Sequence, residues 1–596
     1  MNTKAGGFSL LTSHFSRHAA SPQRGVSLLD SLVGVFLMLV IFLGIAAAFQ
    51  LSVDVITNNK ARAGAVALAN ERMEYIRSLA YASLGTSGGI PSGAIPQTET
   101  ISLNGISYTR RTLIEYVDDA KDGTGASDSN GITADYKQVK VDLAWSSRAG
   151  TRHVTLAARV SPPTGLESAV SGGTLVINAV SSTGAALVGA QVQVVNASTT
   201  PTINETTYTN ASGTVTLIGA PAASNYQITV SELGYSTAQT YSATAQNTNP
   251  SPANLTVTNA HTTTGTFAID VLGSRSVNTW TQILTGTWTD TFADLSKIGT
   301  TTNADISDGV ARLAGSSPYT SPGEVQSFTI GPSYLNKWKT FSWIDAEPPD
   351  TSIRYYVYDG PGTTLVPDAQ LPGNSAGFTT SPVDLTGVST STYQAIRIDA
   401  ILTTSSTTAT PSIDSWSVGY DYGPQPLPSI AFTMQGAKTI GSGPNGTVYK
   451  YNNSGLTTNT SGVVSISNLE WDTYLITVNG TTTGYDIASS CASPQPESLS
   501  PGAMLSTNLY LAAHTQNSLL VDVRSAASGV LLSGSTVVVS RTGFAATSTS
   551  DGCGQTLFPS LMSSNSYTVQ AGATGYATST ATNVSVGGAS TKSMTI

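Results

Sequence analysis

Side chains that build catalytic, metal and nucleic-acid sites are scarce in this chain of 596 residues. It holds two cysteines and five histidines, which leaves little material for nucleophilic catalysis or a zinc site. Charged residues make up only 11% of it, and its formal net charge of −9 gives no basic surface for nucleic acid. No HExxH, no Walker loop and no GxSxG followed by a partnered histidine stands out. We therefore expect no enzyme and no nucleic-acid binder.

Small and hydroxyl-bearing residues are abundant instead, with 56 glycines beside many serines and threonines. A chain of this length is expected to form several domains. Its composition is typical of extracellular β modules rather than of a helical enzyme. We therefore predict a multidomain, mainly β protein.

One long apolar run near the N-terminus departs from this pattern. From Val26 to Phe49 the only ionisable side chain is Asp30. With a rise of ~1.5 Å per residue, a helix over this run matches the hydrocarbon core of a bilayer. Lys4, Arg17 and Arg24 precede the run, and no acid does. This charge distribution predicts a single-pass segment whose leader stays in the cytoplasm while the C-terminal part is exported.

The start of the run, Arg24-Gly25-Val26 with Asp30 four residues on, resembles the type IV prepilin signal. In that family prepilin peptidase cuts after the leader's glycine, and the new first residue is N-methylated. An acid at the fifth mature position pairs with the α-amino group of a neighbouring subunit. The resemblance implies a leader at 1–25, cleavage between Gly25 and Val26, methylation of Val26, and a role of Asp30 in subunit assembly. The family usually has Phe and Glu where this chain has Val26 and Asp30.

Electrostatic considerations also favour a positively charged partner for Asp30. A carboxylate in hydrocarbon is costly and should have a partner, and burying both charges is tolerable only as a pair. The alternative is an uncleaved signal anchor in which Asp30 lies near the membrane interface.

Beyond the apolar run the helix is expected to continue as an amphipathic half, giving a long helix at 26–82. Val55, Val66, Met73 and Ile76 fall on or near one face of it. The glycine-rich stretch 85–93 then ends the helix.

Alternating segments after the helix predict a small antiparallel sheet. A long helix followed by such a sheet resembles a pilin, so we expect a pilin-like α+β head at 83–162. The predicted strands are Ile101–Tyr108, Arg111–Tyr116, Tyr136–Trp145 and His153–Val160.

Aspartates gather in the loop between the second and third of these strands. Dense carboxylates supply the oxygen ligands that Ca²⁺ prefers, but aspartate is also an ordinary turn former. A calcium site and a solvated loop are therefore both kept for Asp118, Asp119, Asp122, Asp128 and Asp135.

An internal repeat follows at 170–260, 428–512 and 516–596. Its copies resemble the carboxypeptidase-regulatory-like, transthyretin-type β-sandwich, which in that family is structural or adhesive and brings no catalytic residues. We expect the ring of the Gly-Tyr pair near each end to pack over a sheet edge or core. The shared features are a polar turn with glycine (Thr209–Gly213, Thr460–Gly462, Ser550–Gly552), a strand led by tyrosine (Tyr226, Tyr474, Tyr567) and the Gly-Tyr pair (Tyr235, Tyr485, Tyr576).

Between the first two copies, residues 265–422 predict a jelly-roll-like β-sandwich, vaguely similar to concanavalin-like or galactose-binding-like modules. Its aromatic rings are expected either to fill the core of the module or to stack on bound sugars, and core filling is the favoured interpretation. The tryptophans concerned are Trp280, Trp288, Trp338, Trp343 and Trp416.

The two cysteines, Cys491 and Cys553, lie in the second and third copies. In an oxidising exterior an even pair is expected to form a disulfide, which would lock the orientation of the two modules.

These features favour a minor pilin or pseudopilin of a type IV pilus or type II secretion filament, which presents its β modules for adhesion or assembly. It would reside in the cytoplasmic membrane before assembly and on the pilus or cell surface afterwards. Its expected partners are prepilin peptidase, other pilin subunits and membrane lipid, with surface glycans or receptors on other cells as candidate ligands. No cofactor other than calcium is considered.

Two alternatives stay open. One is a membrane-anchored surface adhesin that never enters a filament. The other is a carbohydrate-active surface enzyme. A glycosidase needs two carboxylates that lie close together in space, and a sequence alone does not show which carboxylates do so.

Overall fold

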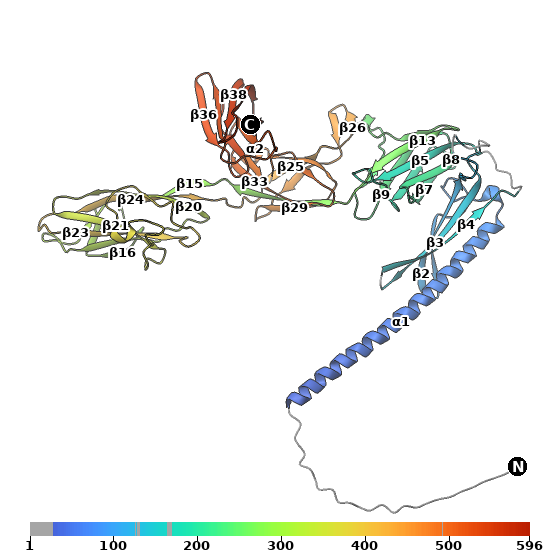
Figure 1. Ribbon diagram of the computed structural model, residues 1–596, viewed down its shortest axis with the longest axis horizontal. Coiled ribbons are helices and arrows are strands. Elements are labelled where there is room, and N and C mark those ends of the chain that lie inside the picture. The colour runs from blue at the N-terminus through green and yellow to red at the C-terminus, as the bar shows by residue number, and fades with distance from the viewer. Residues whose placement is uncertain (1–27, 125–126, 128–131, 149, 164–169, 492) are drawn as a thin grey trace, which may run out of the picture.

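The computed structural model describes residues 28–124, 127, 132–148, 150–163, 170–491 and 493–596, except for the Asp30 side chain. Strands take up 51% of the chain and helices 11%, so the predicted multidomain, mainly β fold with a long N-terminal helix is confirmed. Figure 1 shows the helix, a small head and a row of β modules, two of which diverge at the far end of the row.

The helix α1 (Leu28–Ser78) has 51 residues and is therefore about 76 Å long. A four-stranded antiparallel sheet of the order β1-β2-β3-β4 forms the head behind it. The expected strand at 101–108 is divided, because Asn104 and Gly105 adopt positive φ and make a two-residue hairpin turn. The strands are β1 (Thr98–Leu103), β2 (Ile106–Val117), β3 (Tyr136–Ser147) and β4 (Gly150–Val160), and the short helix η1 (Tyr81–Ser83) precedes them.

The C-terminal half of α1 packs on this sheet through a stripe at helical spacing. Of the four residues expected there, Met73 and Ile76 are buried, whereas Val55 and Val66 are exposed. Small side chains replace them at the contact, which lets the helix lie close to the sheet. The buried stripe consists of Ala61, Ala65, Leu68, Ala69, Met73 and Ile76.

A buried ion cluster fastens α1 to the head. Glu99 of β1 pairs with Arg72 of the helix and, at 3.0 Å, with Arg110 of β2. Arg110 also donates to the Leu68 carbonyl at 3.2 Å and pairs with Glu71 at 3.3 Å. Because both arginines are nearly inaccessible to water, removing Glu99 would leave two buried charges without their main partner.

Three β-sandwiches with one topology follow the head. In each, the first strand lies between the last strand, which runs parallel to it, and an antiparallel neighbour. A second sheet, of five strands in sandwich 1 and of four in sandwiches 2 and 3, closes the core. Sandwich 1 contains β5 (Gly173–Val180), β6 (Gln191–Asn196), β7 (Ile203–Tyr208), β8 (Thr214–Ala220), β9 (Ala223–Ser231), β10 (Ala238–Gln239), β11 (Asn249–Pro250), β12 (Leu255–Val257) and β13 (Thr262–Ala268).

Sandwiches 2 and 3 repeat this order of strands. Sandwich 2 contains β14 (Gly273–Thr281), β25 (Ala431–Gly436), β26 (Thr439–Gly443), β27 (Gly446–Tyr449), β28 (Asn452–Thr457), β29 (Val463–Leu469), β30 (Asp472–Thr477), the short helix α2 (Gly480–Thr483), β31 (Tyr485–Cys491), β32 (Glu497–Leu499) and β33 (Met504–Ala513). Sandwich 3 contains β34 (Ser518–Arg524), β35 (Thr536–Arg541), β36 (Phe544–Thr549), β37 (Gln555–Phe558), β38 (Ser564–Gly572), β39 (Ser579–Val586) and β40 (Ala589–Thr595).

Two of the expected boundaries differ from the structure. Strand β13 closes sandwich 1, so that module extends beyond residue 260. Strand β14 is the first strand of sandwich 2. Both strands lie mostly within the range 265–422 that was expected for the jelly-roll-like module. The jelly-roll-like module is therefore inserted into sandwich 2 after its first strand. Thr281 and Gln425 meet at the base of the insertion, where the Thr281 N–H donates to the Gln425 carbonyl at 2.8 Å.

The inserted module is a sandwich of a six-stranded and a four-stranded sheet. Trp338 and Trp416 are almost fully buried in its core, and Trp343 is 8% exposed. These rings fill the core, as the favoured interpretation of the sequence expected. The strands are β15 (Leu284–Asp290), β16 (Ile298–Thr302), β17 (Ala304–Ser307), β18 (Val310–Leu313), β19 (Gly323–Ser327), β20 (Leu335–Ala346), β21 (Thr351–Asp359), β22 (Val383–Asp384), β23 (Ile396–Thr404) and β24 (Ser412–Tyr422), with the short helix η3 (Asn374–Ala376).

The tyrosine that leads a strand in each copy is the ring that fills the core. Tyr226, Tyr474 and Tyr567 are at most 1% exposed, and each hydroxyl donates to a backbone carbonyl four or five residues upstream. The Gly-Tyr pairs behave less uniformly. Tyr235 and Tyr485 pack partly against their cores, whereas Tyr576 is 42% exposed and does not belong to the described core of the third copy.

Sandwich 2 has an ion pair in its core. The N–H groups of Ala179, Thr279 and Val523 occupy equivalent positions, because they donate to the carbonyls of Gly213, Gly462 and Gly554. Arg275, four residues before Thr279, therefore occupies the position of Leu175 and Leu519. Arg275 is 1% exposed and pairs with Glu497 at 3.1 Å. Glu497 faces the core tyrosine of its copy, as Leu255 and Val584 do in the others.

We predict that Arg275→Leu alone destabilises sandwich 2 by about 3–5 kcal/mol, because it leaves the Glu497 carboxylate buried without its partner. Arg275→Leu combined with Glu497→Val copies the apolar pair of sandwich 3 and should recover most of the loss. Hydrogen exchange of the β33 amides measures both. Equal losses in the single and the double variant would contradict the prediction.

Candidate functional site

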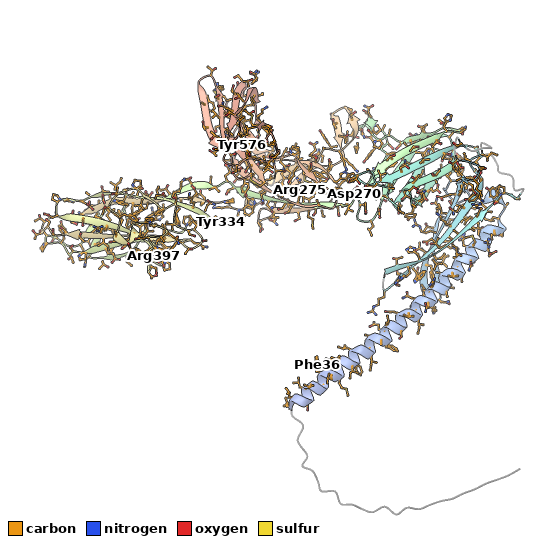
Figure 2. All side chains as sticks on the ribbon, in the orientation of Figure 1. Phe36, Asp270, Arg275, Tyr334, Arg397 and Tyr576 are labelled. Carbon is orange, nitrogen blue, oxygen red and sulfur yellow. A yellow bond between two sulfur atoms is a disulfide. The ribbon has the colours of Figure 1, made fainter. Side chains whose placement is uncertain are left out.

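The N-terminal half of α1 is apolar and uncovered. All described side chains from residue 31 to 53 are exposed, including Phe36 at 60% and Phe42 at 75%. Figure 2 shows Phe36 on the free half of the helix, far from the β modules. By length and composition this helix could cross a membrane. An apolar surface of this size needs a lipid or protein environment.

The residues expected to process and pair this helix lie outside the described part. Gly25 and Val26 precede residue 28, and the side chain of Asp30 is not described, although its backbone is helical. Cleavage, methylation and assembly at these residues therefore stay predictions.

The aspartate loop is held by interactions within the head. The Asp135 carboxylate accepts the N–H of Asp119, and the Asp119 carboxylate pairs with Arg159 of β4 at 3.4 Å. Among the described residues, no group of three or more His, Cys, Asp or Glu side chains could hold a metal ion, and Asp128 lies outside them. Calcium binding by Asp118, Asp119, Asp122, Asp128 and Asp135 stays a prediction.

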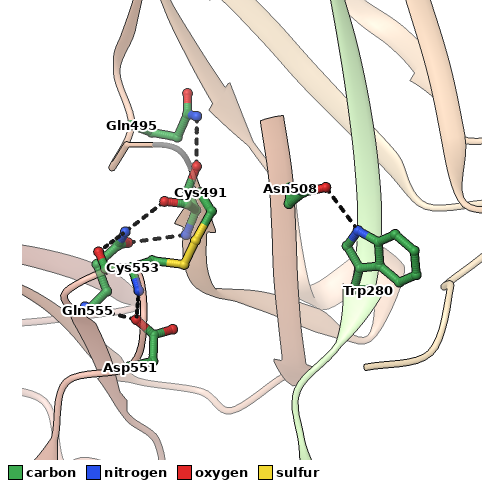
Figure 3. The surroundings of a disulfide bond; sticks show 8 residues. Trp280, Cys491, Gln495, Asn508, Asp551, Cys553 and Gln555 are labelled. Atoms are coloured by element: carbon green, nitrogen blue, oxygen red, sulfur yellow. Dashed lines mark hydrogen bonds between the residues drawn. A yellow bond between two sulfur atoms is a disulfide. The ribbon is translucent and has the colours of Figure 1, made fainter. Parts of the chain in front are cut away.

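Cys491 and Cys553 form a disulfide between sandwiches 2 and 3, with their Cα atoms 5.6 Å apart. Gln555 adds two hydrogen bonds across the same junction (Figure 3). Its Nε2 donates to the Ser490 carbonyl at 2.8 Å, and its Oε1 accepts the Ser490 N–H at 3.2 Å. Because Gln555 is 1% exposed, water does not compete for these bonds, and the two modules are joined firmly at this point.

We predict that Cys491→Ser with Cys553→Ser lowers the stability of this junction by about 2–4 kcal/mol, because the disulfide restricts the unfolded chain. Thermal unfolding of the full chain with and without the substitutions measures the loss. Labelling of the unfolded, unreduced wild-type protein should find no free thiol. Stoichiometric labelling would contradict the bond.

The head and sandwich 1 share a polar junction along the edge strand β7. The Asn204 N–H donates to the Gly88 carbonyl at 2.9 Å, and the Thr206 N–H donates to Gln97 Oε1 at 3.0 Å. Gln97 Nε2 in turn donates to the Asn204 carbonyl at 2.8 Å. The loop between α1 and β1 thus lies along the edge of sandwich 1 and satisfies backbone groups of β7 there.

Two carboxyl groups interact at this junction, that of the fully buried Glu205 and that of the partly buried Glu115. Burial raises the pKa of Glu205 well above its usual range, the Glu115 carboxylate raises it further, and the Ile90 N–H, which donates to Glu205 at 3.0 Å, lowers it. Burial also raises the pKa of Glu115, against the opposing effects of Lys140 and of the Thr207 hydroxyl. The junction therefore favours the protonated carboxyl groups.

We predict that the junction is strongest at acidic pH and weakens as the pH rises above the usual carboxyl range. Both pKa values are raised in the folded state, so the folded state binds more protons than the separated modules do, and stability falls with rising pH. Glu205→Gln should remove most of this dependence. Hydrogen exchange at Asn204 and Thr206 between pH 5 and 8 measures it, with Glu74→Gln on the exposed side of α1 as the control; an unchanged pH slope in Glu205→Gln would refute the assignment.

One carboxylate pair resembles a glycosidase arrangement only superficially. Burial, followed by the neighbouring Glu324, raises the pKa of Asp399 in the inserted module to about 7. Asp399 is 2% exposed, and an acid that must protonate a glycosidic oxygen has to reach its substrate. The structure does not present this pair to a sugar.

Comparison with known proteins identifies one module. Residues 175–269 match the carboxypeptidase regulatory-like domain, a range that runs from β5 to just beyond β13. No curated protein matches the chain.

Solved structures are similar only at a low level. The TIE protein of Bacillus anthracis is 9% identical over 84% of this chain and 73% of its own, with a TM-score of 0.16. The major pilin subunit BcpA of Bacillus cereus is 9% identical over 71% and 98%, with a TM-score of 0.12. The shaft pilin SpaA of Lactobacillus rhamnosus GG is 12% identical over 29% and 86%, with a TM-score of 0.12. These scores are too low to transfer an overall fold or a function.

Proposed function

We propose that this chain is a minor pilin or pseudopilin of a type IV pilus or of a type II secretion filament. The observation that supports this most is the division of α1 into two halves. The C-terminal half is held on the head by the buried stripe and the Glu99 ion cluster. The N-terminal half exposes every described side chain from residue 31 to 53.

Such a helix needs two successive environments. Lipid covers its apolar half in the cytoplasmic membrane before assembly, and the equivalent helices of other subunits cover it in a filament. A lone Asp30 in this half is tolerable only with a positive partner, which the amino group of Val26 in a neighbouring subunit would supply after cleavage.

The size of the exported part supports a minor role in the filament. A major subunit must pack densely along a fibre, whereas three sandwiches and an inserted module project from this head (Figure 1). The modules are therefore a tip or side decoration that serves adhesion or assembly. A membrane-anchored adhesin outside any filament is the main alternative.

We predict that Asp30→Ala reduces incorporation into sheared filaments at least about tenfold while leaving the amount in the membrane unchanged, since an unpaired buried charge costs about 3–5 kcal/mol. Asp30→Glu should restore incorporation, and Asp54→Asn, farther along the same helix, should have no effect. Immunoblots of filament and membrane fractions measure this.

Mass spectrometry of the mature protein provides the complementary measurement. The expected N-terminus is a methylated Val26 without residues 1–25. A protein that still begins at Met1, together with full incorporation of Asp30→Ala, would favour the membrane-anchored adhesin.

A further inference from the structure

The outer face of the three-sandwich repeat differs in sandwich 2. Val277 and Leu509 point into the core there, so alternate residues of β14 and β33 point outward. None of these outward residues is acidic or basic in the two strands, which are both fully described. They are Ser274, Ser276, Asn278 and Trp280 on β14, and Met504, Ser506, Asn508, Tyr510 and Ala512 on β33.

Two aromatic residues are neighbours on this face. Trp280 and Tyr510 are direct partners in the parallel pairing of β14 with β33. Both are half-buried, and neither belongs to the described hydrophobic core of sandwich 2. Trp280 Nε1 donates to Asn508 Oδ1 at 3.2 Å, which fixes the orientation of the indole (Figure 3). We call this pair with its asparagines the aromatic platform.

Amide groups adjoin the two rings. Asn278 Nδ2 donates to Asn508 Oδ1 at 3.1 Å and to Ser506 Oγ at 3.0 Å. The two asparagines and the indole thereby hold one another in place. Cys491 lies on the neighbouring strand β31, directly opposite Asn508, so the disulfide stiffens the same region.

The other two copies show that the fold does not require the aromatic pair. The residue after Thr279 is Trp280, and its equivalents are Val180 in sandwich 1 and Arg524 in sandwich 3. The parallel partner of Val180 is Ala268, and that of Arg524 is Thr595. The hydrogen bond between Asn178 and Thr266 in sandwich 1 shows that the polar ladder is common to the repeat, whereas the aromatic rings are specific to sandwich 2.

We propose that the aromatic platform of Trp280, Tyr510, Asn278 and Asn508 binds neutral glycans. Flat rings offer stacking surfaces to the C–H faces of pyranose sugars, while amides and hydroxyls exchange hydrogen bonds with sugar hydroxyls. The absence of charge among the outward residues of both strands matches an uncharged chain and disfavours nucleic acid or anionic glycans. The inference deepens the proposed adhesive function by naming its ligand class and site.

The test uses the full chain in detergent on an array of neutral hexose and N-acetylhexosamine oligosaccharides, with sialylated and uronic-acid glycans beside them. Wild-type protein should bind neutral glycans. Trp280→Val with Tyr510→Ala, which installs the residues of sandwich 1, should weaken binding at least about tenfold. Trp471→Val, a change of another partly exposed tryptophan of sandwich 2, is the matched control and should bind as the wild type does.

A second measurement tests the proposal on wild-type protein, so that it can be decided even where the double variant fails to fold. In wild-type protein the neutral glycan that binds best should protect Trp280 from N-bromosuccinimide, as mapped by mass spectrometry, and should not protect Trp471. Silence of the array, binding confined to charged glycans, or full binding by the double variant would overturn the proposal. Filament incorporation is measured separately with Asp30→Ala, so loss of glycan binding and loss of the pilin function are distinguishable.

Discussion

The parallel pairing of β14 with β33 is the contact on which the arrangement of the distal modules depends. It joins the first and last strands of sandwich 2 although the whole inserted module lies between β14 and β25. Sandwich 1 meets sandwich 2 near the start of β14, where the Gly502 N–H donates to the Val271 carbonyl at 3.0 Å. The inserted module begins just after the end of β14, and sandwich 3 follows β33. A loosened β14 would therefore disturb all three neighbours, although the β11–β26 pairing still ties sandwich 1 to sandwich 2 and the disulfide still ties sandwich 3 to it.

Local patterns in the sequence correctly predicted the elements that are determined by interactions between residues close in sequence. The helix, the head sheet and the repeated turns arise from periodicity and turn chemistry within a few residues. In each turn one side-chain oxygen accepts two backbone N–H groups; it belongs to Asn210, Asn459 or Asp551. Glycine follows at positive φ. These motifs place the three sandwiches without any knowledge of tertiary contacts.

Non-local pairings could not be predicted in the same way. The opening strand of sandwich 2 is contiguous in sequence with the inserted module, and a reading of the sequence therefore places it in that module, whereas it pairs with β33. Glu115 and Glu205 are isolated acids 90 positions apart, and nothing local shows that both become buried at one junction. Trp280 was counted among the rings of the wrong module, so its pairing with Tyr510 became visible only in the structure.

The direction of the terminal strands decides how a pulling force passes through the exported part. Because the first and last strands of each sandwich are parallel neighbours, the chain enters at one end of the sheet and leaves at the other. A force between these ends shears all hydrogen bonds of the pair together rather than opening them one by one. The inserted module enters by β15 and leaves by β24, which are antiparallel partners from Leu284 and Tyr422 onward. Its two connections lie at one end, so it lies beside the path of the force, and sandwich 2 transmits tension while it also carries this side branch.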